Sequence, residues 1–244
     1  MKQYEAVIKV MEENGGFATL GFLNQEVLKI KDCAWKTKSP FASIRRIVQD
    51  KRFFFKIRPG LWALKSYVNQ LPEEILPSEK QSEKKREEYN HAYYQGLLVE
   101  IGNLRQYQTY VPNQDKNKLF LGRKLCETTS MSDIYKFTYD HMVNRAKTID
   151  VAWFNNRNMP TYLFEIEHST DIQNSLLKFV DLQDFYIDFF IVADLARKIG
   201  YTSKLSFIAF DGIRKRTKFL SYSQLSEWHT KTYQIVTLEN AIGI

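Results

Sequence analysis

Apolar residues recur at helical spacing near the start of the chain. Tyr4, Val7 and Met11 fall on one face of a helix, and the glycine pair at 15–16 ends that helix. The apolar positions of 17–31 continue the pattern. They predict a second helix over this whole stretch.

The stretch 38–51 predicts a third helix. Ser39 is its expected N-cap, and Pro40 suits the first helical position because proline has no backbone N–H to leave unpaired. Ile44 and Val48 would then face inward. The intervening arginines would remain in water.

Two β-rich runs follow at 52–65, on either side of a Pro-Gly turn. Three helices and a hairpin predict a winged helix-turn-helix domain over 1–68, whose third helix would enter a DNA groove. Winged helices also serve as protein–protein modules, and that alternative stays open. With "WKTKSP" before the third helix and "GLWAL" in the wing, the segment resembles the HARE-HTH family of restriction enzymes, chromatin proteins and a bacterial RNA polymerase subunit. The resemblance implies reading of modified bases.

The pattern of polar and apolar residues changes at residue 69 and again at residue 91. Two prolines and a dense mixed-charge run at 69–90 are typical of a linker that becomes an exposed helix. From 91 to 244, helical and strand-like stretches alternate, which predicts an α/β (α+β) domain with a mixed sheet flanked by helices. The expected helices are 91–108 and 171–186, and the expected strands are 148–154, 161–169, 188–194 and 204–210.

The composition narrows the class of protein. With 44% hydrophobic and 26% charged residues and no apolar run of about 18, the 244-residue chain is typical of a soluble protein without a membrane span. Its N-terminus is unlike a secretion signal. Cys33 and Cys126 have no CxxC spacing, so neither a disulfide framework nor a zinc cluster is expected. The expected location is the reducing cytoplasm.

The net charge of +7 is concentrated in one part of the chain. Residues 1–70 hold 13 bases and 6 acids, whereas the other 174 residues hold 22 of each. Such a basic segment indicates a polyanionic partner, double-stranded DNA first, although a merely solvated face has the same composition. The side chains expected to contact DNA are Lys36, Lys38, Ser39, Ser43, Arg45, Arg46 and Arg58.

Two glutamates interrupt the apolar run "TYLFEIEHST" at 161–170. In a strand, Glu165 and Glu167 point to one side while Ile166 points into the core. Carboxylates are rarely buried unless a partner neutralises them. The sequence therefore requires a partner for these two side chains.

A hairpin through the turn 155–160 brings in a third carboxylate. If Phe154 pairs with Thr161, Asp150 falls opposite Glu165, with Cβ atoms about 4.5–5.5 Å apart. Carboxylates crowded in this way repel one another unless a cation lies between them. Mg²⁺, a hard ion that takes oxygen ligands, is the expected cofactor. An ion pair of Asp150 or Glu165 with a lysine or arginine is the rival interpretation.

The spacing Asp150, fourteen residues, Glu165-Ile166-Glu167 resembles the PD-(D/E)xK nuclease superfamily. The resemblance implies that Asp150 and Glu165 bind the metal and that the third position of the triplet takes part in catalysis. That position is usually lysine and is Glu167 here. Some restriction enzymes of the superfamily carry an E-x-E triplet, so the departure leaves activity possible and leaves the orientation of the attacking water open.

The resemblance extends through 164–183, which is similar to the "EVEHST…GLLR…DL" run of one branch of restriction-type nucleases. His168 and Ser169 match it as expected DNA contacts, although His168 also suits the end of a strand. Thr170 with Gln173 makes a capping box, which explains Thr170 structurally.

Two further side chains have both a catalytic and an ordinary interpretation. Lys178 would replace the absent lysine from the following helix, or it is plain surface charge. Glu100 would complete the metal site from the first helix of the domain, as related nucleases do, or it is solvated. His91, His141 and His229 show no ligand spacing.

These observations predict a Mg²⁺-dependent endodeoxyribonuclease, a type II or modification-dependent restriction enzyme that acts as a homodimer. Neither a GxSxG elbow nor a P-loop is present, so a serine hydrolase and an NTPase have no support. Two alternatives remain: a catalytically inactive DNA-binding regulator, and a nuclease for branched or damaged DNA.

Overall fold

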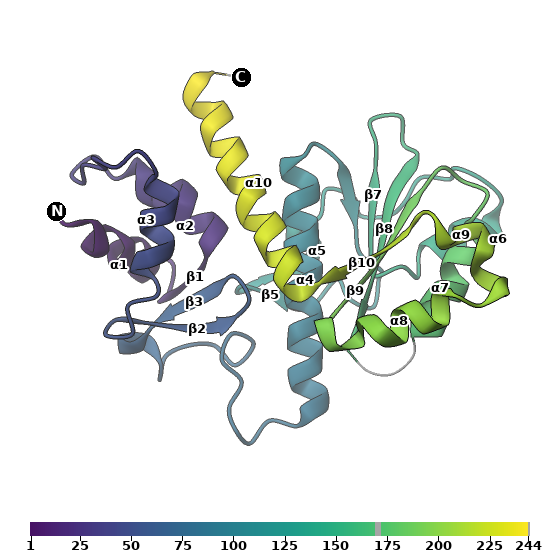
Figure 1. The fold of residues 1–244 in the computed structure, drawn as a ribbon, viewed down its shortest axis with the longest axis horizontal. Helices are drawn as coiled ribbons and strands as arrows, with labels where there is room; N and C mark the ends of the chain where they lie inside the picture. Colours follow the sequence, from purple (N-terminus) through teal and green to yellow (C-terminus); the bar gives the residue numbers. More distant parts are fainter. Residues whose placement is uncertain (169–171, 244) are drawn as a thin grey trace. The chain divides into compact units, whose positions relative to one another are not determined.

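The computed structural model describes residues 1–168 and 172–243, which divide into two compact units (Figure 1). The first unit comprises Met1–Lys80 together with Ser226–Ile244, and the second comprises Gln81–Leu225. The long C-terminal helix α10 (Tyr222–Ile242) therefore starts in one unit and continues in the other.

The first unit combines three helices with a small antiparallel sheet. The strand order is β1-β3-β2, with β3 pairing to both neighbours. Its elements, in chain order, are α1 (Gln3–Glu13), β1 (Phe17–Thr19), α2 (Leu20–Glu26), a 3₁₀ turn η1 (Val27–Lys29), α3 (Pro40–Ile47), β2 (Phe54–Arg58), β3 (Leu61–Leu64) and a second 3₁₀ turn η2 (Lys65–Tyr67).

The first and third predicted helices are confirmed. After α1, Gly16 adopts a φ of +89°, and its N–H donates to the Met11 carbonyl at 2.7 Å. Only glycine adopts this left-handed conformation readily, so the helix ends here. Ile44 of α3 and Val48 at its C-cap are fully buried, as the apolar spacing predicts.

The prediction of one helix over 17–31 is wrong at its start. Phe17–Thr19 form β1, in which Phe17 pairs with Ala63 and Thr19 with Leu61. The Thr19 hydroxyl then accepts from the Phe22 N–H at 3.2 Å and caps α2. Three buried residues in a row fit a strand covered on both faces as well as a helix, and tertiary pairing decides between the two.

The second unit is built on a mixed five-stranded sheet of order β10-β9-β8-β7-β4. β10, β9 and β8 are parallel, whereas β8, β7 and β4 are antiparallel. The mixed α/β fold is thereby confirmed. The elements are α4 (Glu83–Leu104), β4 (Gln108–Tyr110), β5 (Leu119–Phe120), β6 (Arg123–Lys124), α5 (Leu125–Thr128), α6 (Asp140–Ala146), β7 (Val151–Phe154), β8 (Pro160–Glu167), α7 (Ile172–Val180), β9 (Asp188–Ala193), η3 (Leu195–Arg197), α8 (Lys198–Leu205), η4 (Ile208–Phe210), α9 (Asp211–Arg214) and β10 (Thr217–Ser221).

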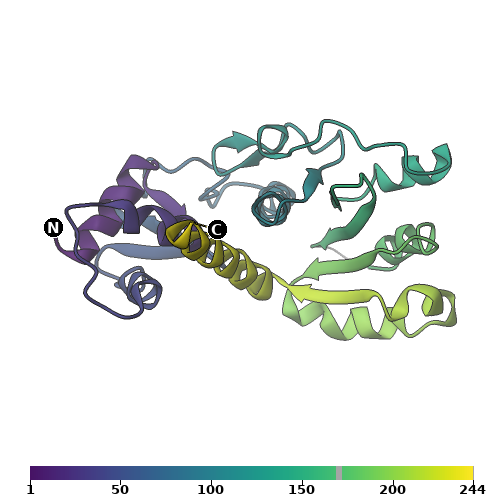
Figure 2. The same ribbon diagram turned by 90° about the horizontal axis from the view of Figure 1, so that it is seen from above.

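Helices cover both faces of this sheet. α4 lies on one face and α7 on the other, as both views show (Figures 1 and 2). On the α4 side, a Cβ added at Gly102 would lie 2.8 Å from Nε1 of Trp153, so glycine permits this close approach. On the α7 side, Leu176 and Phe179 join a core with Leu163 of β8. Because Trp153 of β7 pairs with Tyr162, the neighbour of Leu163, the hairpin serves both helical layers.

The predicted strand at 204–210 is wrong. This apolar run ends α8 and forms the 3₁₀ turn η4, and Ile208 is 87% exposed, whereas Phe210 is buried. The strand lies later, at β10, whose Thr217 pairs with Phe189 of β9. A short apolar run does not distinguish a strand from a helical segment.

The helix predicted at 91–108 starts earlier, at Glu83, where the Ser82 hydroxyl accepts from the Lys85 N–H at 3.3 Å. The charged end of the preceding stretch therefore belongs to α4. None of the helices in the described part of the chain has the length and apolar character needed to span a membrane.

Candidate functional site

The hairpin of β7 and β8 carries the predicted carboxylates. Trp153 pairs with Tyr162, as the predicted register requires. Phe154 pairs with Pro160 rather than with Thr161, because an irregularity in the register lies next to the turn. The register away from the turn is unaffected, so the three carboxylates come to one end of the hairpin.

Asp150 lies just before β7 and is 9% exposed. Its Oδ2 accepts from the Ile166 N–H of β8 at 2.7 Å, and its Oδ1 lies 3.6 Å from Nε2 of His91. Burial alone would raise the pKa of Asp150, but His91 and the Ile166 N–H outweigh it and lower that pKa. Asp150 is therefore held as a carboxylate.

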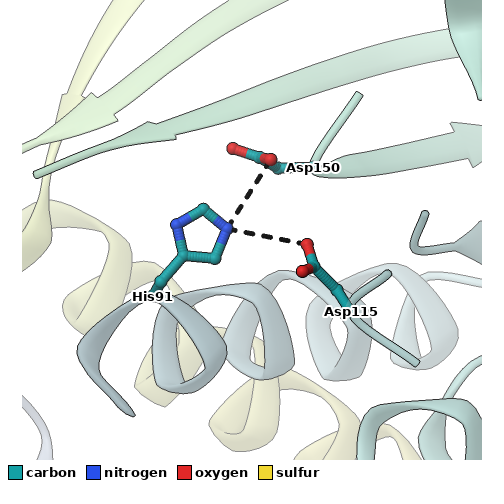
Figure 3. A group of neighbouring side chains, drawn as sticks. All are labelled: His91, Asp115 and Asp150. Carbon is teal, nitrogen blue, oxygen red and sulfur yellow. Dashed lines mark ion pairs between the residues drawn. The ribbon is translucent and has the colours of Figure 1, made fainter. Parts of the chain in front are cut away.

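His91 of α4 lies between two carboxylates, Asp150 and Asp115 of the loop after β4 (Figure 3). Its Nε2 is 3.8 Å from Oδ2 of Asp115, and the candidate ligand atoms of the three residues all lie within 4.8 Å of one another. Burial lowers the pKa of His91, but the two carboxylates outweigh this effect and raise it. These two carboxylates therefore favour the protonated imidazole, and a bound metal would have to displace any proton on Nε2.

Gln95, one turn further along α4, contacts the carboxylate of Asp115 and the backbone of Asp150. It is fully buried, and its Nε2 donates to Oδ2 of Asp115 at 2.7 Å and to the Asp150 carbonyl at 2.9 Å. Lys118 contacts the other oxygen of Asp115 at 2.6 Å. The position of each carboxylate is therefore set before any ligand binds.

The donor set of this His91–Asp115–Asp150 cluster fits a divalent cation. With metal–oxygen distances of about 2.0–2.1 Å, neighbouring ligands of an octahedral ion lie about 3 Å apart and opposite ones about 4.2 Å apart. The separations of 3.6 and 3.8 Å fall between these values. Carboxylates suit Mg²⁺, Ca²⁺ and Mn²⁺, whereas the imidazole is more typical of transition metals.

Glu165 and Glu167 point to the same side of β8, as predicted. The Ser175 hydroxyl of α7 contacts Oε2 of Glu165 at 3.0 Å and also contacts Oε1 of Glu167. Lys178, one turn later, reaches both oxygens of Glu165, at 2.8 and 3.0 Å. The predicted proximity of Lys178 to the carboxylates is present in the structure.

The environment of Glu165 disfavours its charge. Burial and the nearby Asp150 raise the pKa of Glu165 well above its usual range, against the opposing effect of Lys178 and Ser175. Burial likewise raises the pKa of Glu167, which Ser175 opposes. Such groups need a cation close by to stay ionised at neutral pH. For Glu165 that cation is Lys178 here, as the rival ion-pair interpretation expects, whereas Asp150 pairs with His91.

The remaining residues predicted at this site are placed differently. Glu100 lies on α4 but about 140° around the helix from Gln95, so the structure does not bring it to the carboxylates. His168 lines a cavity of about 550 Å³ together with His91 and Glu167. Ser169 and Thr170 lie outside the described residues.

Most of the predicted DNA contacts lie on the surface of the first unit. Ser39 occupies the N-cap position of α3 without a side-chain capping bond, and Ser43 is half-buried. Arg58 is only 9% exposed, and its guanidinium donates to the Glu74 carbonyl at 2.7 Å. It therefore anchors the following loop, which corrects its expected role. The exposed side chains are Lys36, Lys38, Ser39, Arg45 and Arg46.

Little in the sequence indicates a site at His91, Asp115 and Gln95. His91 and Gln95 are four residues apart on a helix, a spacing that places both on one face. Asp115 lies in the loop "PNQDKNK" with no pattern that marks it. The fold alone brings this residue to the start of β7.

The structure therefore defines a mixed α/β unit that carries a cluster of carboxylates and an imidazole at the end of its central hairpin. Residues 70–242 match the family described as the C-terminal domain of the type II restriction enzyme NmeDI. The match covers well over half of the chain, and the chain therefore belongs to this restriction-enzyme family. Membership supports a nuclease of the restriction-endonuclease type with DNA as substrate. The comparisons with curated proteins and with solved structures gave no match.

Proposed function

We propose that the protein is a Mg²⁺-dependent restriction endonuclease with a PD-(D/E)xK-type active site at the β7–β8 hairpin. The observation that carries the proposal is the convergence of four carboxylates, Asp115, Asp150, Glu165 and Glu167, on one end of this hairpin in a restriction-enzyme family. Two catalytic carboxylates from adjacent strands are what the sequence spacing predicts.

Asp150 is the central ligand in this proposal because it contacts His91 and faces the Glu165 charge at the same time. Asp115 and His91 complete its cluster on one side, and Glu165 is the ligand expected on the other. A divalent cation, when bound, supplies Lewis-acid polarisation of the scissile phosphate. The protein positions these ligands through Gln95 and the Ile166 N–H.

The first unit is proposed to bind duplex DNA as a winged helix. Its order of helices and strands, α1-β1-α2-α3-β2-β3, is compatible with this fold, and α3 exposes Arg45 and Arg46 to solvent. The proposed division is 1–68 as the DNA-binding domain, 69–90 as the charged linker and the start of α4, and 91–244 as the nuclease domain, of which Ser226–Ile244 belongs to the first compact unit. Reading of modified bases and action as a homodimer belong to the same proposal.

The cytoplasmic location is proposed from cysteine usage. Cys33 and Cys126 are both free thiols in the structure. Free thiols are typical of a reducing compartment.

Cleavage assays with a ligand variant test the proposed function. Purified protein is incubated with methylated and unmethylated plasmid DNA, in Mg²⁺ or in EDTA, beside Glu165→Gln. We expect nicking or double-strand cleavage in Mg²⁺ only, loss of cleavage in the variant, and unchanged DNA affinity of that variant. Gln can keep the Ser175 contact, removes the charge, and replaces one of the two oxygens that contact Lys178 by an NH2 donor.

The two alternatives give different results in this assay. DNA binding without cleavage of any substrate would indicate the inactive regulator. Cleavage of junctions or damaged DNA alone would indicate the structure-specific nuclease. Full activity of Glu165→Gln would contradict the proposed site.

A further inference from the structure

His168, at the end of β8, has a hydrogen-bonding arrangement that the proposed site does not yet use. Its Nδ1 lies 2.8 Å from the hydroxyl of Tyr222, which starts α10. The same hydroxyl lies 2.9 Å from the Glu167 carbonyl. Both contacts are within the second unit.

The two contacts together fix the position of the imidazole proton. A carbonyl oxygen can only accept, so the single hydrogen of the Tyr222 hydroxyl is donated to Glu167. The hydroxyl oxygen must then accept from His168, which places the ring proton on Nδ1. In a neutral imidazole the other nitrogen, Nε2, consequently carries a lone pair.

A second hydrogen, on Nε2, would have no acceptor among the described residues, so the geometry favours the neutral ring with its proton on Nδ1 alone. Tyr222 is itself held in place, because its ring stacks on Tyr94 of α4 with centroids 3.9 Å apart and planes at 5°. The acceptor character of Nε2 is therefore built into the fold.

The acceptor nitrogen of His168 is enclosed and has no hydrogen-bond partner among the described residues. His168 lines the same cavity as His91 and Glu167, and the two imidazole centroids are 5.7 Å apart. A buried polar atom without a partner is costly, so this nitrogen is suited to a ligand that donates a hydrogen bond. A phosphate oxygen is an acceptor and does not meet this need.

We propose that Nε2 of His168 accepts a hydrogen bond from the water consumed in phosphodiester hydrolysis, and that Tyr222 is the positioning residue that keeps this nitrogen an acceptor. The inference rests on the proposed nuclease function. In this role His168 contacts the water instead of the DNA phosphate that the sequence suggested. It also orients the attacking water, a task left open because Glu167 stands where the nuclease superfamily usually has lysine.

The reaction that this water enters is balanced without a further reactant. The water oxygen forms a bond to phosphorus, and the bond from phosphorus to one bridging ester oxygen breaks. One hydrogen of the water ends on the departing oxygen, and the other ends on the new phosphate monoester. His168 orients the water for this attack and is not consumed.

NMR of the histidine rings tests the tautomer independently of activity. In ¹⁵N-labelled protein, two-bond proton–nitrogen spectra distinguish a protonated from an unprotonated ring nitrogen, and His168→Asn assigns the signal. We expect protonated Nδ1 and unprotonated Nε2 at neutral pH, with this preference lost in Tyr222→Phe. A protonated Nε2 in the wild-type protein would overturn the inference.

Cleavage kinetics of matched variants test whether His168 orients the attacking water. His168→Asn keeps a donor near the Nδ1 position and lacks the second nitrogen, so we expect kcat to fall about 100-fold with little change in KM. His168→Gln returns an acceptor near Nε2 and should recover part of kcat, whereas exposed His141→Asn should match the wild type.

The outcomes separate the two proposals. Unchanged kcat in His168→Asn, with wild-type cleavage intact, would overturn the role of His168 alone. A wild-type protein that never cleaves DNA would overturn the proposed function, and with it the role of the water.

Discussion

Replacing Lys178 by methionine removes the cation that contacts both oxygens of Glu165. Glu165 is 2% exposed and faces the charge of Asp150, so it would remain in a buried site without its closest positive partner. Breaking a buried ion pair in this way costs about 3–5 kcal/mol. Because the Lys178 side chain is 26% exposed, we expect the lower end, about 3 kcal/mol.

Thermal unfolding in EDTA measures this cost. For a chain of this size a loss of about 3 kcal/mol lowers Tm by roughly 6–12 °C, provided that the transition of the second unit is followed. The double variant Lys178→Met/Glu165→Gln removes both charges and should regain most of the loss, as a double-mutant cycle reports. Added Mg²⁺ should raise the Tm of the single variant more than that of the wild type, since a cation would replace the lysine.

A Tm of Lys178→Met within about 1 °C of the wild type in EDTA would refute the reasoning. It would mean that Glu165 is protonated or hydrated in solution. The ion pair would then contribute nothing to the positions of the carboxylates.

Three further predictions concern DNA binding, the contacts of Gln95 with the two aspartates of the cation site, and the packing of the first unit. Arg45→Ala/Arg46→Ala should lower the salt slope of DNA binding by about 2, as filter binding at several salt concentrations would show. The control Lys2→Ala/Lys9→Ala, at the N-cap of α1 and within it, should leave the slope unchanged. Gln95→Leu removes the donor to Asp115 and the Asp150 carbonyl and should weaken divalent-cation binding about 10–100-fold by calorimetry. Gly21→Val would place Cβ 2.8 Å from the Tyr233 ring and 3.0 Å from His229 and should destabilise the first unit by about 1–3 kcal/mol in urea unfolding.

The sequence predicted the central hairpin because its signals are local. Alternation along β8 and the turn after Phe154 determine which residues face each other, and Trp153 does pair with Tyr162. The irregularity at the turn, where Phe154 pairs with Pro160, depends on backbone geometry that residue types do not reveal. The predicted pairing is correct where the side-chain pattern alone determines which residues face each other.

The cluster around His91 was missed because it depends on tertiary contacts. Asp115 reaches Asp150 only through the path of the loop after β4, and Gln95 serves both through one amide group. The sequence favoured Glu100 over His91 as a ligand on this helix, but Glu100 lies elsewhere around α4. Arg58 looked like an exposed base, yet its partner is a backbone carbonyl sixteen residues away.

Calorimetric titration of Mn²⁺ into the wild-type protein and into Asp150→Asn tests the central claim most directly. Asp150 is the residue shared by the His91–Asp115 cluster and the Glu165 side of the site. We predict one tight ion per chain in the wild type and affinity reduced at least about 10-fold in the variant, which keeps the acceptor for the Ile166 N–H. Equal binding by both proteins, or no binding by the wild type, would contradict a cation site at the β7–β8 hairpin.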